Sequence, residues 1–397
     1  MTKVYVAGVG MIPFVKPGTS AAYDEMGATA ARMALTDAGV DYKDVQQAYV
    51  GYVYGDSTSG QRALYEVGVT GIPIVNVNNN CSTGSSALFL ARQAVASGVV
   101  DCAMALGFEQ MVPGALQEVY KDRPSPLDRF LELADEALPE ARSAPMAVRL
   151  FGAAGAEYQQ RYGARPETFA KITQKARRHA EHNERAIFRS QLSVEEILAS
   201  PQMLGPLTRL QCCPPTCGAA AAIIVSEAFA KRHGLDMRVA IRGQAMTSDY
   251  SSTFDEGSMM KIVGYDLARS AAARVYEEAG IGAEDVDVVE LHDCFTPNEI
   301  FSYEALGLTP EGTAERFVED GDNTYGGRVV TNPSGGLLAK GHPLGATGLA
   351  QCAELTWQLR GETGPRQVEG ARIALQHNLG LGGACVVTLY ERQAAHG

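Results

Sequence analysis

Residues 30–52, AARMALTDAGVDYKDVQQAYVGY, have a counterpart far along the chain at residues 271–293, AAARVYEEAGIGAEDVDVVELHD. When Gly39 is set on Gly280, the alanines before the two glycines coincide, and so do an aspartate and a valine shortly after them. Each stretch is helix-like up to an Ala-Gly pair, where glycine suits a left-handed C-terminal cap, and an apolar strand-like run follows. The pattern predicts helix, turn and strand in both places.

Two further matches follow in the same order along the chain. CSTGSSALFLARQAV, which begins at Cys81, resembles HPLGATGLAQCAEL, which begins at His342. GAAAAIIVSE, which begins at Gly218, resembles GGACVVTLYE, which begins at Gly382, and both are typical of buried strands. Three matches in one order indicate an internal duplication. We therefore predict an α/β protein whose two homologous halves pack about a pseudo-twofold axis, with mainly parallel sheets covered by helices.

The spacing of these matches locates an insertion in the first half. Cys81 and Gly218 are 137 positions apart, whereas His342 and Gly382 are only 40 positions apart. The additional residues include several charged helical segments and differ in composition from the rest of the chain. We predict an N-terminal half at residues 1–118 and 207–250, an inserted loop domain at residues 119–206, and a C-terminal half at residues 251–397.

Composition and charge narrow the class of protein. The chain has 397 residues, of which 46% are hydrophobic and 20% charged, as expected for an ordinary folded protein. Its net charge of -12 argues against a nucleic-acid partner, which requires a dominant basic face. No apolar run approaches the ~20 residues of a membrane-spanning helix, the first residues are already strand-like, and the final AAHG is not a peroxisomal signal. We expect a cytoplasmic protein that does not insert into membranes.

The eight cysteines are predicted to be thiols, because no export signal accompanies them. Cys212, Cys213 and Cys217 form a C-C-x-x-x-C pattern that resembles half of a zinc site. A structural zinc site needs a second ligand pair at suitable spacing, and the sequence does not supply one. No metal site is predicted.

The aligned residues Cys81 and His342 indicate a reaction centre. A cysteine at a helix start meets unpaired N–H groups and the positive end of the helix dipole, which favour its thiolate, and its own N–H can serve as an oxyanion donor. A buried, unreactive cysteine is the alternative for Cys81, and a capping or core histidine is the alternative for His342. The duplication favours catalysis, because the pseudo-twofold axis brings a base to a thiol. The five glycines of residues 332–348, NPSGGLLAKGHPLGATG, also indicate close approach of the backbone.

Two other stretches offer groups to the same centre. LHDCF follows the second repeated strand, and on an extended segment His292 and Cys294 point to one side while Asp293 points away. Packing or turn chemistry is the alternative for both residues. QHNLGLGGA precedes the last predicted strand, and Gly380 in it could present a backbone N–H to a carbonyl oxygen, although glycine-rich turns are common.

Several long stretches are similar to thiolases, and specifically to the sterol carrier protein-x type of 3-ketoacyl-CoA thiolase. The likeness covers nearly the whole chain. Its most specific motifs are GIPIVNVNNNCSTGSSALF, ELHDCF, NPSGGLLAKGHPLGATGLAQCAELTWQLRGE and ALQHNLGLGGACVVTLY.

The resemblance implies a five-layered αβαβα thiolase fold, a homodimer or dimer of dimers, and coenzyme A entering beside the loop domain as a substrate, with no permanently bound cofactor. It implies that Cys81 is the acyl-accepting nucleophile, that His342 is its base and an oxyanion donor, and that Cys294 is the second acid/base. Many thiolases place that second cysteine in a terminal Cys-x-Gly motif, where this chain has His377-Asn378-Leu379. His292 stands where many relatives have asparagine, and it would polarise the thioester oxygen.

The implied activity is cleavage or formation of a carbon-carbon bond in 3-ketoacyl-CoA, with free CoA as the acyl acceptor. The alternatives are a thiolase-fold acyltransferase that uses a non-CoA acceptor and a partner subunit of a larger complex. Basic side chains cluster in the predicted insertion, and the candidates for contact with the CoA phosphates are Lys175, Arg177 and Arg178, together with Lys171 and Arg185. For each of them a solvated helix face is the alternative.

Overall fold

The computed structural model describes residues 2–114, 116 and 118–394. Residues 1, 115, 117 and 395–397 lie outside this description, and with them most of the tail to which the prediction about a C-terminal signal refers.

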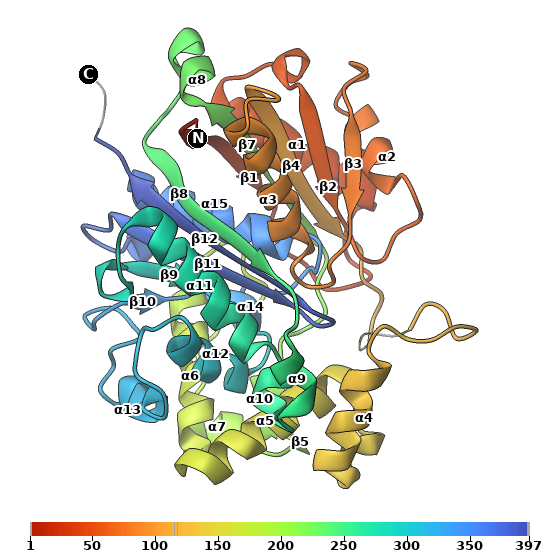
Figure 1. The fold of residues 1–397 in the computed structure, drawn as a ribbon, viewed down its shortest axis with the longest axis vertical. Helices are drawn as coiled ribbons and strands as arrows, with labels where there is room; N and C mark the ends of the chain where they lie inside the picture. The colour runs from red at the N-terminus through yellow and green to blue at the C-terminus, as the bar shows by residue number, and fades with distance from the viewer. Residues whose placement is uncertain (1, 115, 117, 395–397) are drawn as a thin grey trace.

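The N-terminal half is built from strands and helices that alternate along the chain (Figure 1). Its strands are β1 (Val4–Met11), β2 (Gln47–Gly51), β3 (Ile74–Val77), β4 (Cys102–Glu109) and β7 (Gly218–Ser226). Its helices are α1 (Tyr23–Ala38), η1 (Tyr42–Asp44), α2 (Ser59–Tyr65), α3 (Thr83–Ala96) and α8 (Glu227–His233).

The C-terminal half repeats this succession with additional short helices. Its strands are β8 (Val239–Thr247), β9 (Val288–Glu290), β10 (Val330–Thr331), β11 (Ile373–Gly380) and β12 (Ala384–Arg392). Its helices are α9 (Ser251–Asp255), α10 (Met259–Ile262), α11 (Tyr265–Ala279), η4 (Ala283–Asp285), α12 (Thr296–Ala305), α13 (Ala314–Glu319), α14 (Gly336–Ala339), α15 (Thr347–Arg360) and η5 (Gly364–Arg366).

The strand order confirms the duplication. The ten strands run β10-β9-β11-β12-β8-β1-β7-β4-β2-β3. Counted outward from the junction of β1 with β8, equivalent strands of the two halves occupy equivalent places. At this junction the two halves pair over only two residues of each strand.

The prediction of mainly parallel sheets is wrong. In each half the two outer pairings are parallel and the two inner pairings, which involve β7 or β12, are antiparallel. The physical reason is visible in the second half, where only residues 381–383 separate β11 from β12. So short a connection permits only an antiparallel hairpin, and the duplication gives β4 and β7 the same arrangement.

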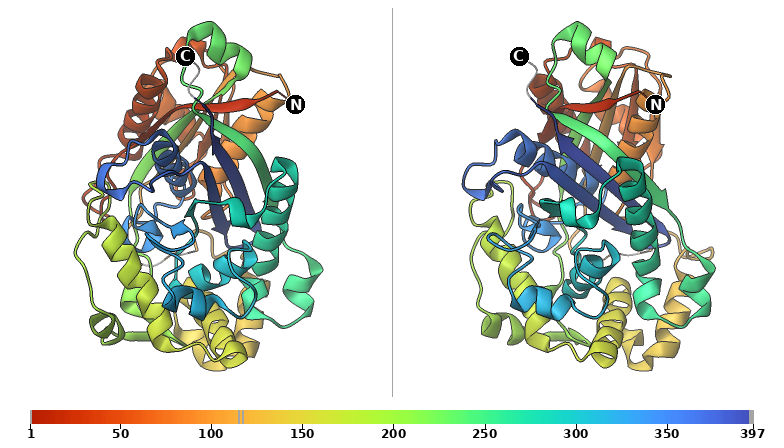
Figure 2. Two further views of the ribbon diagram at one scale, coloured as in Figure 1. Left: turned by 90° about the vertical axis from the view of Figure 1, so that its left-hand side faces the viewer. Right: turned by 60° about the vertical axis from the view of Figure 1, so that its left-hand side comes forward.

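Three hydrophobic clusters divide the molecule into layers (Figures 1 and 2). The central cluster contains the apolar faces of α3 and α15 together with residues from strands of both halves. A second cluster packs α1 on the outer face of the N-terminal strands, and a third packs α11 on the outer face of the C-terminal strands. The resulting succession of helix, sheet, helix, sheet and helix confirms the predicted five-layered αβαβα fold.

Equivalent glycines have equivalent structural roles in the two halves. Gly39 and Gly280 cap α1 and α11 in the left-handed conformation, with φ of 69° and 71°. Gly84 and Gly345 instead permit the two central helix starts to touch, because a Cβ on Gly84 would lie 2.7 Å from the carbonyl oxygen of Gly345. The two halves are therefore in backbone contact close to Cys81 and His342.

The chain between β4 and β7 forms the insertion. It contains α4 (Asp128–Ala137), η2 (Pro139–Ser143), α5 (Met146–Tyr162), α6 (Pro166–Ala180), α7 (Val194–Leu198), β5 (Gln202–Leu204), β6 (Leu207–Thr208) and η3 (Arg209–Gln211). The helices α4 to α7 gather at the end of the molecule that lies opposite the start of β1 and the end of β12 (Figures 1 and 2). In the described part of the chain, no helix combines the length and the apolarity needed to span a membrane.

Candidate active site

Cys81 lies in the turn between β3 and α3. The turn reverses at Asn80, whose φ of 51° is left-handed and whose side-chain amide donates to the carbonyl of Leu381 at 3.2 Å. The helix begins at Thr83, two residues after the cysteine, and β3 before it is a partly buried edge strand. Cys81 is 6% exposed and lies at the helix start as predicted.

His342 occupies the equivalent place before α15. Its Nδ1 lies 2.7 Å from Oγ1 of Thr347, and this hydroxyl donates its only hydrogen to the carbonyl of Pro343 at 2.9 Å. Nδ1 must therefore carry the imidazole proton and donate it to Thr347. The consequence is that Nε2 of His342 presents a lone pair, and this buried nitrogen has no hydrogen-bond partner within the described chain.

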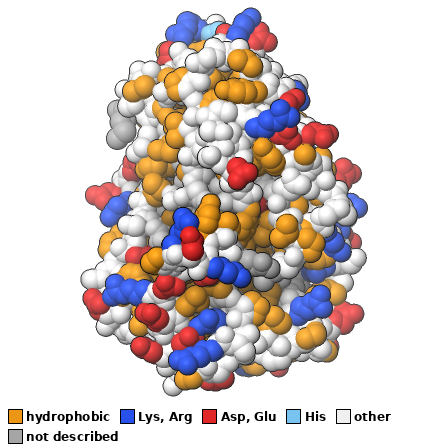
Figure 3. Space-filling model, turned by 90° about the vertical axis from the view of Figure 1, so that its right-hand side faces the viewer, with side chains coloured by type: hydrophobic (Ala, Val, Ile, Leu, Met, Phe, Trp, Pro, Cys, Tyr) orange, Lys and Arg blue, Asp and Glu red, His pale blue; other side chains and the backbone are white. Residues whose placement is uncertain are grey.

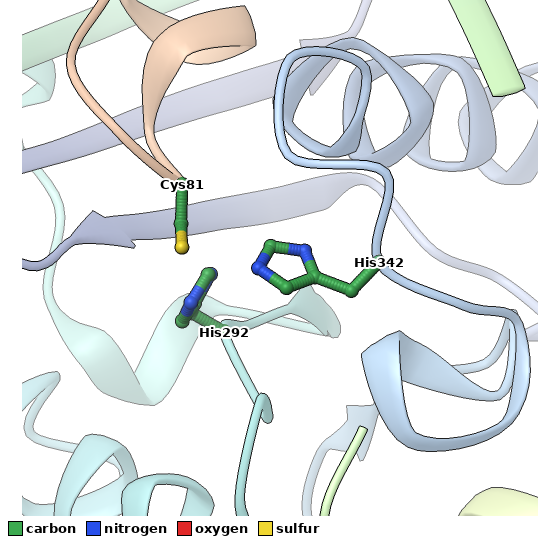
Figure 4. Close-up of side chains that lie close together, drawn as sticks. All are labelled: Cys81, His292 and His342. Atoms are coloured by element: carbon green, nitrogen blue, oxygen red, sulfur yellow. The ribbon is translucent and has the colours of Figure 1, made fainter. Parts of the chain in front are cut away.

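The structure brings the thiol and two imidazoles together. The sulfur of Cys81 and ring nitrogens of His292 and His342 all lie within 4.8 Å of one another. Figure 4 shows the sulfur directed toward the space between the two rings. The ring centroids of His292 and His342 are 5.0 Å apart at an interplanar angle of 82°, so one ring meets the other edge-on.

The LHDCF segment has the alternation that the sequence predicts. His292 and Cys294 both line the cavity in which Cys81 lies. Asp293 points away and accepts hydrogen bonds from the backbone N–H groups of Leu337 at 2.7 Å and Leu338 at 3.4 Å.

Gly380 is the last residue of β11 and lies against the Cys81 turn. A Cβ at this position would lie 2.2 Å from the carbonyl oxygen of Asn79 and 3.0 Å from the nitrogen of Ser82, so only glycine fits. Its neighbours Leu379 and Leu381 line the cavity. The role of its N–H as an oxyanion donor remains a prediction.

Burial sets the protonation states at the centre. It raises the pKa of the Cys81 thiol to about 12, and the carboxylate of Glu109 adds to the effect. It lowers the pKa of His342 to about 3 and brings the pKa of His292 well below its ordinary value. The expected stabilisation of a resting thiolate is therefore wrong, because desolvation opposes the charged form. The resting pair is therefore a neutral thiol facing a neutral imidazole.

The cavity above these groups is large and mainly apolar. Its volume is about 740 Å³, and its lining comes from both halves and from the insertion. Apolar members of the lining include Met111, Met146, Phe151, Met203, Leu338 and Leu381. Figure 3 shows one face of the molecule, on which hydrophobic side chains gather around a recess with Lys and Arg side chains beside it.

The predicted basic residues have different surroundings. Lys175 is buried and forms an ion pair with Glu299, so its ammonium group does not reach a ligand in solution, and a role in binding CoA phosphates is not supported. Arg178 is exposed and donates to Thr324 at 2.8 Å. Arg177 lines the cavity, as does Arg209, which was not among the predicted contacts.

The remaining two basic residues are engaged by protein groups. Lys171 forms an ion pair with Glu319, and Arg185 donates to the carbonyl of Met11 at 3.2 Å.

Sequence reasoning missed three residues that support the centre. Thr347 orients His342, and its alignment with Ser86 in the repeat was an available signal. Glu109 accepts hydrogen bonds from the backbone of Val53, Tyr54 and Gly345 at 3.1, 2.9 and 3.0 Å, and so links the His342 loop to the N-terminal half. Asn378 contacts both the Cys81 turn and His292.

Known proteins identify the family. Residues 4–228 match the family described as "Thiolase, N-terminal domain", and residues 250–390 match "Thiolase C-terminal domain-like". This chain belongs to the thiolase family. It is 54% identical over 394 residues to "Sterol carrier protein 2" of Rattus norvegicus, covering 98% of this chain and 72% of the relative. It is 35% identical over 365 residues to "Acetyl-CoA acetyltransferase" of Methanothermobacter thermautotrophicus, covering 90% and 92%.

Solved structures agree on the fold. The structure titled "Ltp2-ChsH2(DUF35) aldolase" superposes with a TM-score of 0.84 at 22% identity, covering 99% of this chain and 98% of that one. Human mitochondrial 3-ketoacyl-CoA thiolase in complex with CoA superposes with a TM-score of 0.74 at 19% identity, covering 99% and 98%. Family membership and fold together make this protein a thiolase-family acyltransferase.

The same three side chains have the donor types of a transition-metal site. One sulfur and two imidazole nitrogens within 4.8 Å resemble the ligand set of zinc proteins. Binding would require a lone pair on each ring nitrogen that faces the metal, so the protonation of His292 decides whether the site can accept an ion.

Proposed function

We propose that the protein is a 3-ketoacyl-CoA thiolase that transfers an acyl group through Cys81 to CoA. The observation that carries this proposal is the pairing of the Cys81 sulfur with the unpartnered Nε2 of His342 in a large apolar cavity. A cysteine next to a neutral base is the arrangement that covalent acyl transfer requires.

The first step follows from the protonation states. As the Cys81 sulfur attacks the 3-keto carbon, Nε2 of His342 accepts the thiol proton, so the nucleophile is charged only while it reacts. The backbone N–H groups of Cys81 and Gly380 are the proposed donors to the oxyanion that forms. The carbon-carbon bond then breaks, and the acyl group remains on the sulfur.

The second product leaves as the enolate of a short acyl-CoA. Its oxygen requires hydrogen-bond donors, and the imidazoles of His292 and His342 are the proposed ones. Cys294, whose pKa burial raises well above the ordinary value, is a neutral thiol that can protonate the enolate carbon. Free CoA then attacks the acyl-enzyme. Its thiol proton passes to the Cys294 thiolate, and the released Cys81 sulfur regains a proton from the protonated His342. The reverse sequence forms the carbon-carbon bond with the same groups.

The proposed CoA contacts are limited to side chains near the cavity. Arg177 lines the cavity and Arg178 is exposed on the same helix, so we retain both as candidates for the phosphate groups. The cytoplasmic location and the homodimer or dimer of dimers are likewise proposals. The domain boundaries are also proposals, and we move the start of the C-terminal half from residue 251 to the start of β8 at Val239, because β8 is the counterpart of β1. Support for a dimer comes from β3, an edge strand with Val75 44% exposed, which offers unpaired backbone groups to a second copy.

The proposal is tested with a panel of 3-ketoacyl-CoA esters, from acetoacetyl to steroid-bearing chains. We expect cleavage that depends on added CoA and yields a shorter acyl-CoA. Cleavage that proceeds equally well without CoA would contradict the proposal and favour a carbon-carbon lyase.

A second candidate is a catalytic subunit that acts with a partner on a different acceptor. It is favoured by the TM-score of 0.84 with a structure whose title names a complex with a DUF35 protein and an aldolase activity. Under this candidate the isolated chain would show no turnover with any ester of the panel, although Cys81 would still react.

A further inference from the structure

Asn378 lies between the nucleophile and His292. It is fully buried on β11, and its side-chain Nδ2 lies 3.1 Å from the carbonyl oxygen of Cys81 and 3.0 Å from Nδ1 of His292. One amide group therefore contacts the residue that bears the reactive sulfur and the imidazole that faces it.

The surrounding hydrogen bonds fix which way this amide points. Gln376 donates through Nε2 to the carbonyl of Gly348 and to Oγ of Ser85, the latter at 2.8 Å. Ser85 therefore uses its own hydrogen to donate to Oδ1 of Asn378 at 2.8 Å. At the other end the carbonyl oxygen of Cys81 can only accept. Both ends of the network place the NH₂ group of Asn378 against His292.

The consequence concerns the tautomer of His292. Nδ1 faces an N–H donor, so it must accept, and a neutral imidazole then carries its proton on Nε2. In the described chain, His292 forms no hydrogen bond through Nε2, and the residue lines the cavity. His292 thus offers the cavity an N–H group, whereas His342 offers a lone pair.

We propose that Asn378 is a positioning residue that holds His292 as the Nε2–H tautomer and thereby makes it a donor to the enolate oxygen. Two different hydrogen-bond partners then give the two histidines different tautomers. Thr347 keeps the proton of His342 on Nδ1 so that Nε2 is a base, and Asn378 keeps the proton of His292 on Nε2 so that it is a donor. The inference rests on the proposed thiolase function for its kinetic consequence, but the tautomer itself does not depend on any substrate.

The kinetic test compares Asn378→Asp with Asn378→Ala. A carboxylate accepts from Nδ1–H, so the aspartate variant should force the opposite tautomer and turn a lone pair toward the enolate oxygen. We expect kcat to fall ~100- to 1,000-fold in Asn378→Asp, as when a preorganised oxyanion donor is lost, with little change in KM. Asn378→Ala lets His292 adopt either tautomer and should cost only ~10-fold.

A merely structural role predicts the reverse order. Aspartate has the shape of asparagine, whereas alanine leaves a void, so packing alone would make Asn378→Ala the more damaged variant. An alanine variant that is less active than the aspartate variant would overturn the proposal. Ser85→Ala is a further variant, which removes the bond to Oδ1 without changing Asn378 and should give an effect between wild type and Asn378→Asp.

The direct test is nuclear magnetic resonance of the full chain labelled with ¹⁵N-histidine. The signals of His292 among the seven histidines are assigned by their loss in His292→Gln. We expect the Nε2–H pattern in wild type and the Nδ1–H pattern in Asn378→Asp. An Nδ1–H pattern in wild type would overturn the inference whatever the activity, whereas a failed ester panel with the Nε2–H pattern intact would remove only the proposed function.

Discussion

The two halves of this molecule share a framework and differ at the points where chemistry occurs. Equivalent strands, equivalent left-handed glycine caps and equivalent central helices recur in the same order. Yet the start of α3 carries Cys81, whereas the start of α15 carries His342. The duplication thus provides two positions that face each other, and substitution at those positions provides the proposed nucleophile and its proposed base.

The halves also differ between their last two strands. Residues 381–383 connect β11 to β12, whereas the connection from β4 to β7 contains the helices α4 to α7. Those helices supply Met146 and Phe151 to the cavity wall. The repeated frame therefore fixes the geometry of Cys81 and His342, while the insertion builds the space in which an acyl chain would lie.

Removing the Cys81 thiol should reduce turnover more than any other change. Cys81→Ala leaves the N-terminal half without a nucleophile, so we expect no acyl-enzyme by mass spectrometry and a fall in turnover of at least ~10⁴-fold. Cys385→Ala is the matched control, because this buried cysteine lies in β12 and outside the cavity lining. Acyl-enzyme that persists in Cys81→Ala would refute the assignment.

The second thiol tests the contribution of the C-terminal half. Cys294→Ala should still accept an acyl group from an activated donor, because Cys81 and His342 remain, but the enolate carbon loses its acid. We expect thiolysis to fall ~100- to 10,000-fold and exchange of the acetyl methyl protons, followed in D₂O, to disappear. Cys213→Ala is the control, since Cys213 lines the same cavity and contacts Cys294 through its backbone. Normal exchange in Cys294→Ala would assign the acid elsewhere.

The contact between the two helix starts can be broken without touching a reactive group. In Gly84→Ala the new Cβ would press on the carbonyl of Gly345, which is backbone and cannot rotate away. We expect unfolding to become easier by ~1–3 kcal/mol and activity to fall as the sulfur and the imidazole separate. Gly27→Ala is the control. Gly27 lies in helix α1, and its Cβ would meet only side chains, those of Ala63 and Phe108 at 3.1 Å and Leu106 at 3.7 Å. Equal stability of the two variants would show that this contact does not hold the halves.

The fold was predictable from the sequence because a duplication leaves two copies of each signal. The Ala-Gly pairs at Gly39 and Gly280 and the alignment of Cys81 with His342 were enough to place the halves and their shared centre. The direction of β7 and β12 was not predictable from apolar runs, since buried parallel and antiparallel strands look alike. The short connection at residues 381–383 does indicate an antiparallel pair, but only once the ends of β11 and β12 are known.

The reactive side chains of the site were predictable because they occur in recognisable motifs. Their burial, protonation and hydrogen-bond partners were less predictable, because these depend on the packed surroundings. Cys81, His292, Cys294 and His342 line one cavity as expected. The burial of Lys175 and the dependence of His292 on Asn378 arise from residues far apart in sequence, and neither helical periodicity nor local charge reports such contacts. The helix start suggested a thiolate at Cys81, but the depth of burial, which reverses that expectation, is a property of the packed fold.

The smallest effect concerns the pH dependence of Cys81 itself. An ordinary cysteine, with a pKa of about 8.5, is about nine-tenths thiolate at a pH of about 9.5, so its alkylation rate is levelling off by then. Because burial raises the pKa of Cys81 to about 12, we expect its alkylation by iodoacetamide, followed by peptide mass spectrometry, to increase from pH 7 to 9.5 without levelling off.

Glu109 should modulate this profile in a defined direction. Burial raises the pKa of Glu109 to about 7, and above that pH its negative charge disfavours a second negative charge on Cys81. Glu109→Gln should therefore speed alkylation above pH 7, by less than ~10-fold, and leave it unchanged at pH 6, where wild-type Glu109 is largely protonated. A rate that levels off near pH 8.5 in wild type would mean that the helix start outweighs burial after all, and that Cys81 is largely a thiolate at that pH.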